Sequence, residues 1–550
     1  MAVVLGVNGV FHDPAAAIVV DGRTVAASEE ERFSRRKHGK DPVPFSTWEL
    51  PAAAAQWCLE SAGVAPAELD AVAYSYEPGL ALQAADPTAS EWEALRTLFV
   101  QRAPRFLQTI LPGLDPDRVR FVPHHVAHAA SAYLLSPFPT SAVMVLDGRG
   151  EGGSSLLGVF RHGAFEELAA VALPDSMGLL YEEATEHLGF RRSSDEYKVM
   201  ALAAYGRPRH LEKLRETVRV VPGGRFVTGS IDWSSFAPRR AATDDWDERH
   251  ADLAASLQRV LEEVQLGLAR WLHAVTGEQR LVMAGGVALN CVANTRLWAD
   301  GPFDDIWIQP AAGDAGTALG AACFVANDLS DDIEPMTTAA LGRSWSDDEV
   351  AAELRRAGVV FETPENLPET IADVLAADGI VALVEGRSEW GPRALGQRSL
   401  LANPTRAANL ERLNDVKGRE QFRPVAPMVL ADRAGEIFTG PMPSPYMLFT
   451  HQVRPEWQDR IPAVVHVDGS ARAQSVEPGD APLMASILTA FERRTGVPVL
   501  VNTSLNTGGR PMVDSPRDAL ECFGSSPIDL MVIGGHVIWK SAAGAAARVA

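Results

Sequence analysis

Cysteine is scarce in this sequence. The 550 residues contain four cysteines, and no two of them are spaced as a C-x-x-C pair. This scarcity excludes the disulfide framework of a small secreted protein and the cysteine pairs of a zinc knuckle. It favours a protein of a reducing compartment. The four are Cys58, Cys291, Cys323 and Cys522.

Positive charge is also in short supply. Lys and Arg number 50 against 71 Asp and Glu, which gives a formal net charge of −21 at pH 7. A surface this acidic repels phosphate backbones and anionic lipids. We therefore expect neither a nucleic-acid partner nor a membrane partner.

Long uninterrupted hydrophobic runs and common enzyme motifs are missing as well. The uncharged stretch 121–146 contains three histidines and three prolines, so it does not read as a membrane span. The opening residues MAVVLGVNGVFHD lack the basic region and cleavage site of a signal peptide, and we expect a cytoplasmic protein. The absence of G-x-S-x-G, H-E-x-x-H, Walker A and dinucleotide motifs removes the main support for those enzyme classes.

What the sequence does contain is a duplicated strand–turn–strand pattern. Residues 1–29 hold apolar runs joined at Asp21-Gly22, a strong hairpin signal, and residues 141–160 repeat the arrangement. Two later segments, RLVMAGGVALNCVANTRL and IWIQPAAGDAGTALGAACF, each read as strand, glycine turn and helix. Backbone amides at such turns and helix starts bind anions. The pattern predicts an α/β protein with an actin-like, two-lobed nucleotide-binding fold.

A change of composition marks a domain boundary. The polar, acidic segment 328–345 is followed by two helical patterns and a new apolar strand, IVALVEG. The remaining 205 or so residues are enough for a separate α/β domain. We therefore predict two domains, residues 1–340 and 341–550.

Histidines in HHVAH suggest a metal site. His124 and His128 are four residues apart, so on a helix they share a face, whereas His125 is expected to point elsewhere. Asp147 and Asp314 stand at the ends of predicted strands beside glycines and can complete the ligand set. Two imidazoles with carboxylates suit Fe(II), Mn(II), Co(II) or Zn(II). The alternative is a pair of core histidines and two turn aspartates.

A second candidate lies at the N-terminus. His12 follows the first strand, where an imidazole can act as a general base or pair with a phosphate; the alternative is a histidine that only caps a turn. The segment EEERFSRRKHGK is densely charged. Arg35, Arg36, Lys37 and Lys40 either form a solvated cluster or close over a phosphorylated ligand.

The second domain gathers cations in spite of the acidic total. Arg387, Arg393 and Arg398 lie in EGRSEWGPRALGQRS, and Lys417, Arg419 and Arg423 lie in NDVKGREQFRPVAP. Arg forks and a Lys point charge suit oxyanion recognition, and a solvated basic face is the alternative. Further on, Thr503, Ser504 and Asn506 offer uncharged donors in LVNTSLNTGG.

Taken together, these segments resemble the O-carbamoyltransferase family, which includes the nodulation-factor, cephamycin and nebramycin carbamoyltransferases. The resemblance rests on FHDPAAAIVVDG with EEERFSRRKH, HHVAHAAS, VMVLDGRGE, DEYKVMALAAYG, AGGVALNCVAN, PAAGDAGTALGAA, EWGPRALGQRS, VKGREQFRPVAP and VNTSLNTGGRPMV. They occur in family order and span nearly the whole chain.

The resemblance implies a fold and a reaction. Residues 1–340 would form a Kae1-like transfer domain of the actin-like (ASKHA) class, and residues 341–550 a YrdC-like domain. The YrdC-like domain would make carbamoyl-adenylate from ATP, as its Mg(II) complex, and carbamoyl phosphate. The Kae1-like domain would pass the carbamoyl group to a hydroxyl of a small natural-product acceptor. The oligomeric state stays open between a monomer and a homodimer.

The resemblance also assigns residues. His124, His128, Asp147 and Asp314 become the ligands of Fe(II) or another divalent metal. We expect the catalytic residues to be His12, Lys37, Asp195 and Ser504. The binding of ATP and carbamoyl phosphate falls to Arg393, Lys417, Arg419, Arg423, Arg472, Asn502, Thr503, Ser504 and Asn506, and in the first domain to Gly148, Gly285, Gly286 and Asn290.

Two rival functions share part of this pattern. A small-molecule kinase of the actin-like superfamily would use the duplicated turns, but would leave the second domain's cations and the His–Asp set without a role. Such a kinase would yield ADP, whereas carbamoyl-adenylate formation yields pyrophosphate and in the end AMP. A module of the threonylcarbamoylation type would need an extended basic surface for its RNA, and the net charge of −21 argues against one.

Overall fold

The computed structural model describes residues 2–39, 49–82 and 91–540 and divides into two compact units, Met1–Thr337 and Thr338–Ala550. Lys40, one of the cations singled out above, lies outside the described residues. Among the helices described, none combines the length and the apolar character needed to cross a membrane.

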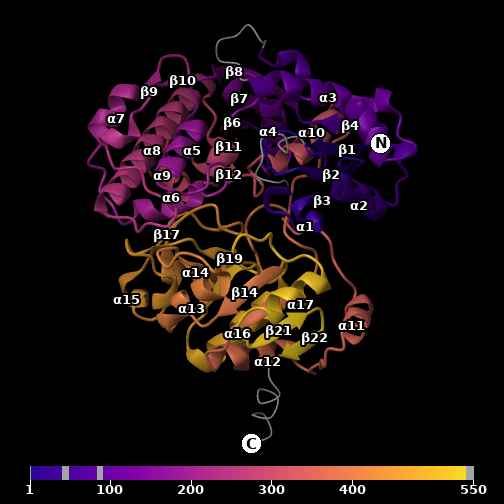
Figure 1. Ribbon diagram of the computed structural model, residues 1–550, viewed down its shortest axis with the longest axis vertical. Coiled ribbons are helices and arrows are strands. Elements are labelled where there is room, and N and C mark those ends of the chain that lie inside the picture. The colour runs from indigo at the N-terminus through magenta and orange to yellow at the C-terminus, as the bar shows by residue number, and fades with distance from the viewer. Residues whose placement is uncertain (1, 40–48, 83–90, 541–550) are drawn as a thin grey trace, which may run out of the picture. The chain divides into compact units, whose positions relative to one another are not determined.

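Unit 1 contains two five-stranded sheets of the same plan (Figure 1). In each sheet, two antiparallel strands lie on one side of the central strand and two parallel strands lie on the other side. The duplicated pattern in the sequence therefore corresponds to a duplicated sheet. The first has the order β3-β2-β1-β4-β5, with β1 (Val3–Asn8), β2 (Ala15–Val20), β3 (Arg23–Glu29), β4 (Ala71–Tyr74) and β5 (Val119–Phe121). The second has the order β12-β11-β6-β7-β8, with β6 (Ser141–Leu146), β7 (Gly153–Arg161), β8 (Ala164–Ala172), β11 (Arg280–Ala284) and β12 (Asp305–Ile308).

Two buried helices connect these sheets. Helix α4 (His124–Tyr133) contacts β6 and β11, helix α10 (Ala315–Asp328) contacts β1 and β2, and the two helices pack on each other. The packing is so close that a Cβ at Gly6 would stand 1.8 Å from the carbonyl oxygen of Ala318. A Cβ at Gly320 would stand 1.9 Å from the carbonyl oxygen of Ala127. Small residues in Ala- and Gly-rich α4 and α10 thus permit the contact, because larger side chains would hold the backbones apart.

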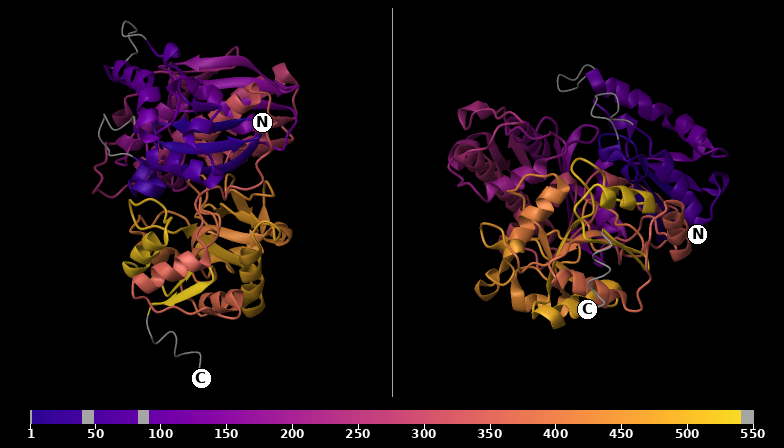
Figure 2. Two further views of the ribbon diagram at one scale, coloured as in Figure 1. Left: turned by 90° about the vertical axis from the view of Figure 1, so that its right-hand side faces the viewer. Right: turned by 60° about the horizontal axis from the view of Figure 1, so that its bottom comes forward.

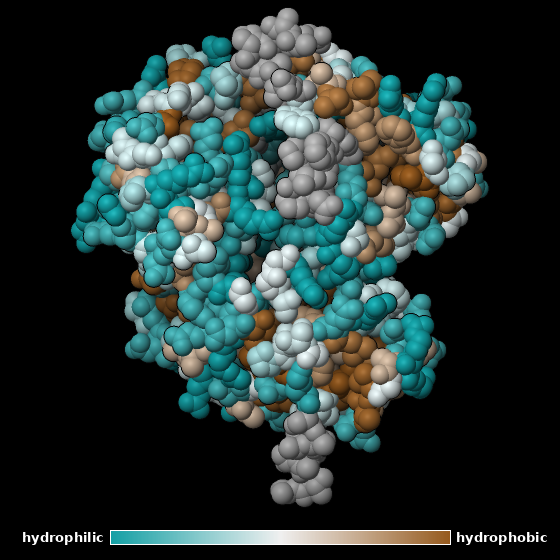
Figure 3. Space-filling view, in the orientation of Figure 1, coloured by the Kyte–Doolittle hydropathy of each residue, from teal (hydrophilic) through white to brown (hydrophobic). Residues whose placement is uncertain are grey.

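Further helices cover the outer faces of unit 1. The large apolar side chains exposed on one of them, α3, are Trp92, Leu95, Leu98 and Phe106, and Figure 3 shows brown residues over this region. The remaining elements are α1 (Glu31–Ser34), α2 (Ala52–Ala62), α3 (Glu91–Ile110), α5 (Met177–His187), α6 (Glu196–Ala203), α7 (Leu211–Thr217), β9 (Val218–Val221), β10 (Arg225–Thr228), α8 (Glu248–Thr276) and α9 (Cys291–Asp300).

Unit 2 is built on a seven-stranded mixed sheet, which can be followed in Figures 1 and 2. Its order is β19-β15-β20-β14-β13-β21-β22, with β13 (Val381–Val384), β14 (Arg398–Ala402), β15 (Ala426–Leu430), β19 (Gln474–Val476), β20 (Val499–Ser504), β21 (Leu530–Ile533) and β22 (His536–Trp539). A small second sheet contains β16 (Phe438–Thr439), β17 (His451–Val453) and β18 (Ser470–Ala471). The helices are α11 (Asp347–Arg356), α12 (Leu367–Ala376), α13 (Ala408–Lys417), α14 (Ala431–Ile437), α15 (Pro455–Gln458), α16 (Pro482–Thr495) and α17 (Pro516–Gly524).

The unit has its own hydrophobic core. Ile371 of α12, Leu383 of β13 and Phe491 of α16 are fully buried in one cluster. The periodic apolar positions of α11 and α12 and the apolar run of β13 agree with the predicted restart of structure after residue 345.

Candidate functional site

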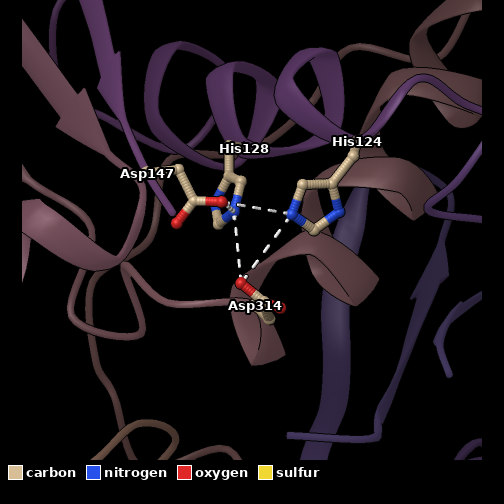
Figure 4. A group of neighbouring side chains, drawn as sticks. All are labelled: His124, His128, Asp147 and Asp314. Carbon is tan, nitrogen blue, oxygen red and sulfur yellow. Dashed lines mark ion pairs between the residues drawn. The ribbon is translucent and has the colours of Figure 1, made fainter. Parts of the chain in front are cut away.

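Four side chains predicted as metal ligands converge in unit 1 (Figure 4). His124 and His128 extend from the first turns of α4, Asp147 follows the last residue of β6, and Asp314 directly precedes α10. One ligand atom from each residue lies within 4.8 Å of the others. The close packing of α4 on α10 is what brings the histidines to Asp314.

The distances within this group match a coordination shell better than hydrogen bonds. His124 Nε2 lies 3.5 Å from Asp147 Oδ2 and 3.7 Å from Asp314 Oδ1, and His128 Nε2 lies 3.7 Å from each of the same oxygens. Hydrogen bonds of this kind span about 2.7–3.2 Å. Ligands about 2.1 Å from a tetrahedral ion stand about 3.4 Å from one another.

The buried nitrogen atoms support the same interpretation. In the part of the chain that the structure describes, His124 Nε2 and both ring nitrogens of His128 are buried without a hydrogen-bond partner. His124 Nδ1 lies 3.2 Å from the carbonyl oxygen of Ser75, to which it donates. In the neutral ring of His124 the lone pair is therefore on Nε2, the nitrogen that faces the carboxylates. Buried polar atoms are seldom left without partners, and a divalent cation would satisfy them together.

The electrostatics of this group point to a site for positive charge. Burial opposes ionisation of every member, yet Asp147 and Asp314 raise the pKa of His124 well above its usual value. The pKa of His128 is instead lowered, chiefly by burial. Burial alone would raise the pKa of both carboxyls, but the neighbouring histidines hold the pKa of Asp147 well below, and that of Asp314 below, its ordinary value.

Glycine turns hold the two carboxylates in place. The amide of Gly286 donates to Asp147 Oδ1 at 2.9 Å, and the amide of His12 donates to Asp314 Oδ2 at 3.1 Å. Gly285 has φ of +90°, and a Cβ there would stand 2.2 Å from the carbonyl oxygen of Leu146, so the turn needs glycine. Gly148 follows Asp147 directly. The predicted Gly-Gly turn therefore binds a carboxylate of the chain itself.

Two neighbours differ from the sequence prediction or were absent from it. His125 was expected to point elsewhere, but its Nε2 lies 3.7 Å from Asp147 Oδ2. Its ring fits against Gly150 of the loop after β6, where a Cβ would stand 3.0 Å from it. Glu151 of the same loop is buried and accepts the amide of His124 at 2.9 Å, which fixes the start of α4. In the sequence, only the short distance between Glu151 and Asp147, four positions, could have pointed to Glu151.

Asn290 caps a helix in this structure. Its Oδ1 accepts the amide of Ala293 at 3.0 Å and so caps α9, and its Nδ2 donates to Gln258 Oε1 at 2.9 Å. The side chain that we expected at a nucleotide is thus used to start a helix.

His12 and Lys37 lie in a second polar cluster of unit 1. His12 Nδ1 is 2.8 Å from Asp13 Oδ2, and His38 Nδ1 is 2.9 Å from Asp13 Oδ1. These are hydrogen-bond distances, unlike those of the first group. Lys37 Nζ pairs with Glu31 Oε2 at 3.4 Å. Burial alone would lower the pKa of Lys37, but Glu31 raises it.

Asp195 organises the loop before α6. Its Oδ2 accepts the amide of Arg191 at 3.1 Å and pairs with Lys198 Nζ at 3.0 Å. The adjacent Glu196 was not predicted. Burial, with Glu182 nearby, raises the pKa of Glu196 to about 7. Apart from the segment DEYKVM, no local sequence pattern indicates a functional role for Asp195 or Glu196.

In unit 2, predicted residues meet at the end of β20. Lys417 is only 5% exposed. Its Nζ donates to Ser504 Oγ at 2.9 Å and to Asn506 Oδ1 at 2.6 Å. Asn502 lies on the same face of the strand as Ser504, while Thr503 between them points to the opposite face.

The arginines predicted for oxyanion binding differ in their hydrogen-bond partners. Arg419 donates to Asn414 Oδ1 and Arg423 pairs with Glu420 at 3.5 Å, both in the loop that follows α13. Arg393 and Arg472 are partly buried, and Arg472 Nε finds no hydrogen-bond partner among the described residues. Arg387 and Arg398 differ from these four, because each guanidinium group donates to two or more backbone carbonyls. Arg387 donates to the carbonyl oxygens of Leu341 and Gly342. Arg398 donates to the carbonyl oxygens of Arg343, Glu385, Gly386 and Gln397.

Glu389 and Asn502 of unit 2 each have a buried acceptor atom with no donor among the described residues. Glu389, 1% exposed, accepts the amides of Leu395, Gln397 and Arg398 through Oε1, while its Oε2 has no partner in the described residues. Asn502 Nδ2 donates to Ala394 and Gln474, and its Oδ1 is likewise without a donor there. Such atoms suit a polar ligand that brings its own N–H or O–H groups. Glu389 was missed because a lone Glu in EWGPRALG gives no signal of burial.

Comparison with known proteins covers both units. Residues 3–323 match the family model described as carbamoyltransferase N-terminus, and residues 372–540 match the one described as carbamoyltransferase C-terminus. The nodulation protein NolNO of Sinorhizobium fredii is 38% identical, over 98% of this chain and 80% of its own. Nodulation protein U of Bradyrhizobium diazoefficiens is 34% identical over 91% of each chain.

Solved structures resemble the chain only distantly. HypF of T. kodakarensis, at 15% identity, covers 60% of this chain and 49% of its own with a TM-score of 0.37. The fold description therefore rests on the sheet order of this chain. Because one family model alone matches more than half of the residues and the second matches most of unit 2, the chain belongs to the carbamoyltransferase family.

Proposed function

We propose that the protein is an ATP-dependent O-carbamoyltransferase that works through carbamoyl-adenylate. Unit 2, the YrdC-like domain in this proposal, forms the adenylate. Unit 1, the Kae1-like domain of actin-like fold, transfers the carbamoyl group to a hydroxyl of a small natural-product acceptor. The observation that carries the proposal is the buried Lys417 ammonium, held by Ser504 and Asn506 within the segment that matches the C-terminal family model.

The first step can be balanced on these residues. Water converts carbamoyl phosphate to carbamate and phosphate, a carbamate oxygen attacks the α-phosphorus of ATP, and pyrophosphate leaves. Lys417 offers a point charge to the phosphates, and Arg393, Arg419, Arg423 and Arg472 supply forked donors. The unsatisfied acceptors Glu389 Oε2 and Asn502 Oδ1 suit the N–H groups of the carbamate or of adenine. ATP would enter as its Mg(II) complex.

The second step falls to unit 1. The acceptor oxygen forms a bond to the carbamoyl carbon, the bond from that carbon to the adenylate oxygen breaks, and AMP leaves. The proton of the hydroxyl passes to His12, the general base of the proposal. His124, His128, Asp147 and Asp314 would hold Fe(II) or another divalent ion, which when bound supplies a Lewis acid beside the reacting group.

The products distinguish this proposal from its rival. The protein is incubated with ATP and carbamoyl phosphate, and hydroxylated natural products are screened by mass spectrometry for the gain of one carbamoyl group. We expect pyrophosphate and AMP from ATP. ADP without carbamoylation would replace the proposal by a small-molecule kinase.

Two variants separate the steps. Ser504→Glu places a carboxylate beside Lys417 among the phosphates, so we expect pyrophosphate release to stop. Ser486→Glu, an exposed serine of α16, is the matched control and should leave it intact. His12→Asn should keep pyrophosphate release and lose carbamoyl transfer; unchanged transfer would rule out His12 as the base.

A further inference from the structure

A chain of four polar side chains leads away from His12. His12 Nδ1 is 2.8 Å from one oxygen of Asp13, and His38 Nδ1 is 2.9 Å from the other. His38 Nε2 in turn lies 2.8 Å from Ser194 Oγ, although 156 residues separate the two in sequence. The rings of His12 and His38 lie 4.4 Å apart between centroids.

These distances define where the protons are. A carboxylate only accepts hydrogen bonds, so each Nδ1 that contacts Asp13 carries its hydrogen. The basic nitrogen of both neutral rings is then Nε2. In His38 that atom accepts the hydroxyl hydrogen of Ser194. In His12 it is the atom that can take a proton from a substrate.

The backbone is held in an unusual shape to make these contacts. Asp13, His38 and Ser193 all have positive φ, at 44°, 61° and 56°, which costs energy for residues other than glycine. Each of these three backbone conformations is held by a hydrogen bond with a residue other than His12, Asp13, His38 and Ser194. Asn8 Nδ2 donates to the carbonyl of Asp13 at 3.0 Å, Glu31 accepts the amide of His38 at 2.8 Å, and Glu196 accepts the amide of Ser193 at 2.8 Å.

We propose that Asp13 and His38 are positioning residues for His12, and that Ser194 ties them to the loop before α6. Asp13 fixes the Nδ1–H tautomer of His12 and stabilises the imidazolium that forms when His12 takes the hydroxyl proton. His38 holds the Asp13 carboxylate in the orientation that serves His12. The inference rests on the proposed function, because it takes His12 as the base of the transfer step.

The first experiment reads the tautomers directly. The full-length protein is labelled with ¹⁵N-histidine, and long-range ¹H–¹⁵N correlations are recorded, with each ring assigned by substitution. We expect the Nδ1–H form for both His12 and His38. In Asp13→Asn one side of the new amide donates, so one ring must change its tautomer. Nε2–H forms in the native protein, or unchanged signals in Asp13→Asn, would overturn the proposal.

The second experiment separates a positioning role from a structural one through two variants of His38. In His38→Asn the amide nitrogen stands near the place of Nδ1 and can still donate to Asp13. In His38→Gln the amide nitrogen stands near the place of Nε2, and that donor is lost. Asn also tolerates positive φ better than Gln. The matched controls are His162→Asn and His162→Gln, because His162 is an exposed histidine with φ of 53° and measures the backbone effect alone.

Kinetics then report the two steps with ATP and carbamoyl phosphate, with glycerol and water as hydroxyl probes. Pyrophosphate release measures the first step, and AMP release measures transfer. We expect Asp13→Asn to slow AMP release by about 10²- to 10⁴-fold, as for a carboxylate that orients a catalytic histidine, with pyrophosphate release retained. His38→Gln should also slow AMP release, and His38→Asn should restore most of it. Equal effects of the two His38 variants, beyond their His162 controls, would overturn the proposal.

The outcomes also separate this inference from the proposed function. If the native protein releases no pyrophosphate, the two-step function fails, while the tautomer measurement still decides whether Asp13 and His38 set the state of His12.

Discussion

At the scale of single residues, histidine and aspartate form two groups in unit 1 that differ in the distances between their side chains and in burial. His124, His128 and their aspartates stand 3.5–3.7 Å apart, whereas His12 and His38 stand 2.8 and 2.9 Å from Asp13. The longer separation leaves room for an ion between the ligands, and the shorter one holds a proton. The same residue types thus suit metal binding in one group and proton transfer in the other.

Glu196 offers a test of the electrostatics beside the second group. Its pKa is raised from 4.5 to about 7, mainly by burial. Between these values the folded state binds more protons than the unfolded state, so the free energy of unfolding falls as pH rises. We expect Glu196→Gln to be more stable than the native protein at pH 8, and this advantage to shrink by about 1 kcal/mol at pH 6. Urea unfolding at both pH values measures it.

The control for this prediction is Glu167→Gln, an exposed glutamate of β8. Its substitution measures the effect of replacing an exposed carboxyl by an amide at the same two pH values. If the stability change of Glu196→Gln shows the same pH dependence as that of the control, burial does not raise the pKa of Glu196.

The sequence was informative about residues whose chemistry depends on local spacing. The four-residue interval between His124 and His128 places both on one helix face, and Gly148 beside Asp147 marks a strand end. Asp314 was expected at a strand end as well, but it lies six residues after β12 and directly before α10. Ser194 could not be predicted, because its partner His38 lies 156 residues away. For a related reason the sequence did not show the carbonyl partners of Arg387 and Arg398. A cation pattern does not reveal that backbone carbonyls already occupy the guanidinium groups.

At the scale of elements, local signals explain the hairpins and not the parallel pairings. The Asp21-Gly22 turn predicts the contact of β2 with β3, since both strands are adjacent in the chain. The parallel contact of β11 with β6 joins residues more than 130 positions apart and has no local signal. The packing of α4 on α10, which assembles the four candidate ligands, is of the same long-range kind.

The crossing of α4 and α10 gives an element-scale prediction. In Gly320→Ala the new Cβ would stand 1.9 Å from the carbonyl oxygen of Ala127, a backbone atom between the two candidate ligands of α4. The helices must separate, so we expect a loss of about 1–3 kcal/mol in the free energy of unfolding. We also expect divalent-metal affinity to fall on the order of tenfold, although Gly320 touches no ligand. Urea unfolding and metal titration measure the two effects.

Gly435→Ala is the control for this substitution. Gly435 also lies in a helix, α14, and a Cβ there meets nothing within 4 Å. This variant should be neutral or slightly more stable, because alanine favours helix. If Gly320→Ala kept native metal affinity, the close crossing would not determine the geometry of the ligands.

At the scale of the whole molecule, the net charge of −21 describes the total and not the sites. Lys417, Arg393 and Arg472 all belong to unit 2, and the proposed function assigns them to small anions. The acidic total therefore argues against a large anionic partner and leaves phosphorylated small molecules open. Each unit also buries its own apolar cluster, one around Leu5 and Val72 and the other around Leu383 and Phe491.

Separate cores lead to the last prediction, which concerns how ligands stabilise the two units. A ligand that binds only the folded form of one unit stabilises that unit, by about 2.7 kcal/mol at a hundredfold excess over its Kd. In calorimetry of the full-length protein we expect two transitions. Removing divalent metal with a chelator should lower only the transition of unit 1, and α,β-methylene-ATP should raise the transition of unit 2. Asp147→Asn should abolish the first response and Ser504→Glu the second, each without changing the other, because the residues belong to different cores. A single transition that responds to both ligands would contradict the prediction and would mean that the two cores unfold as one.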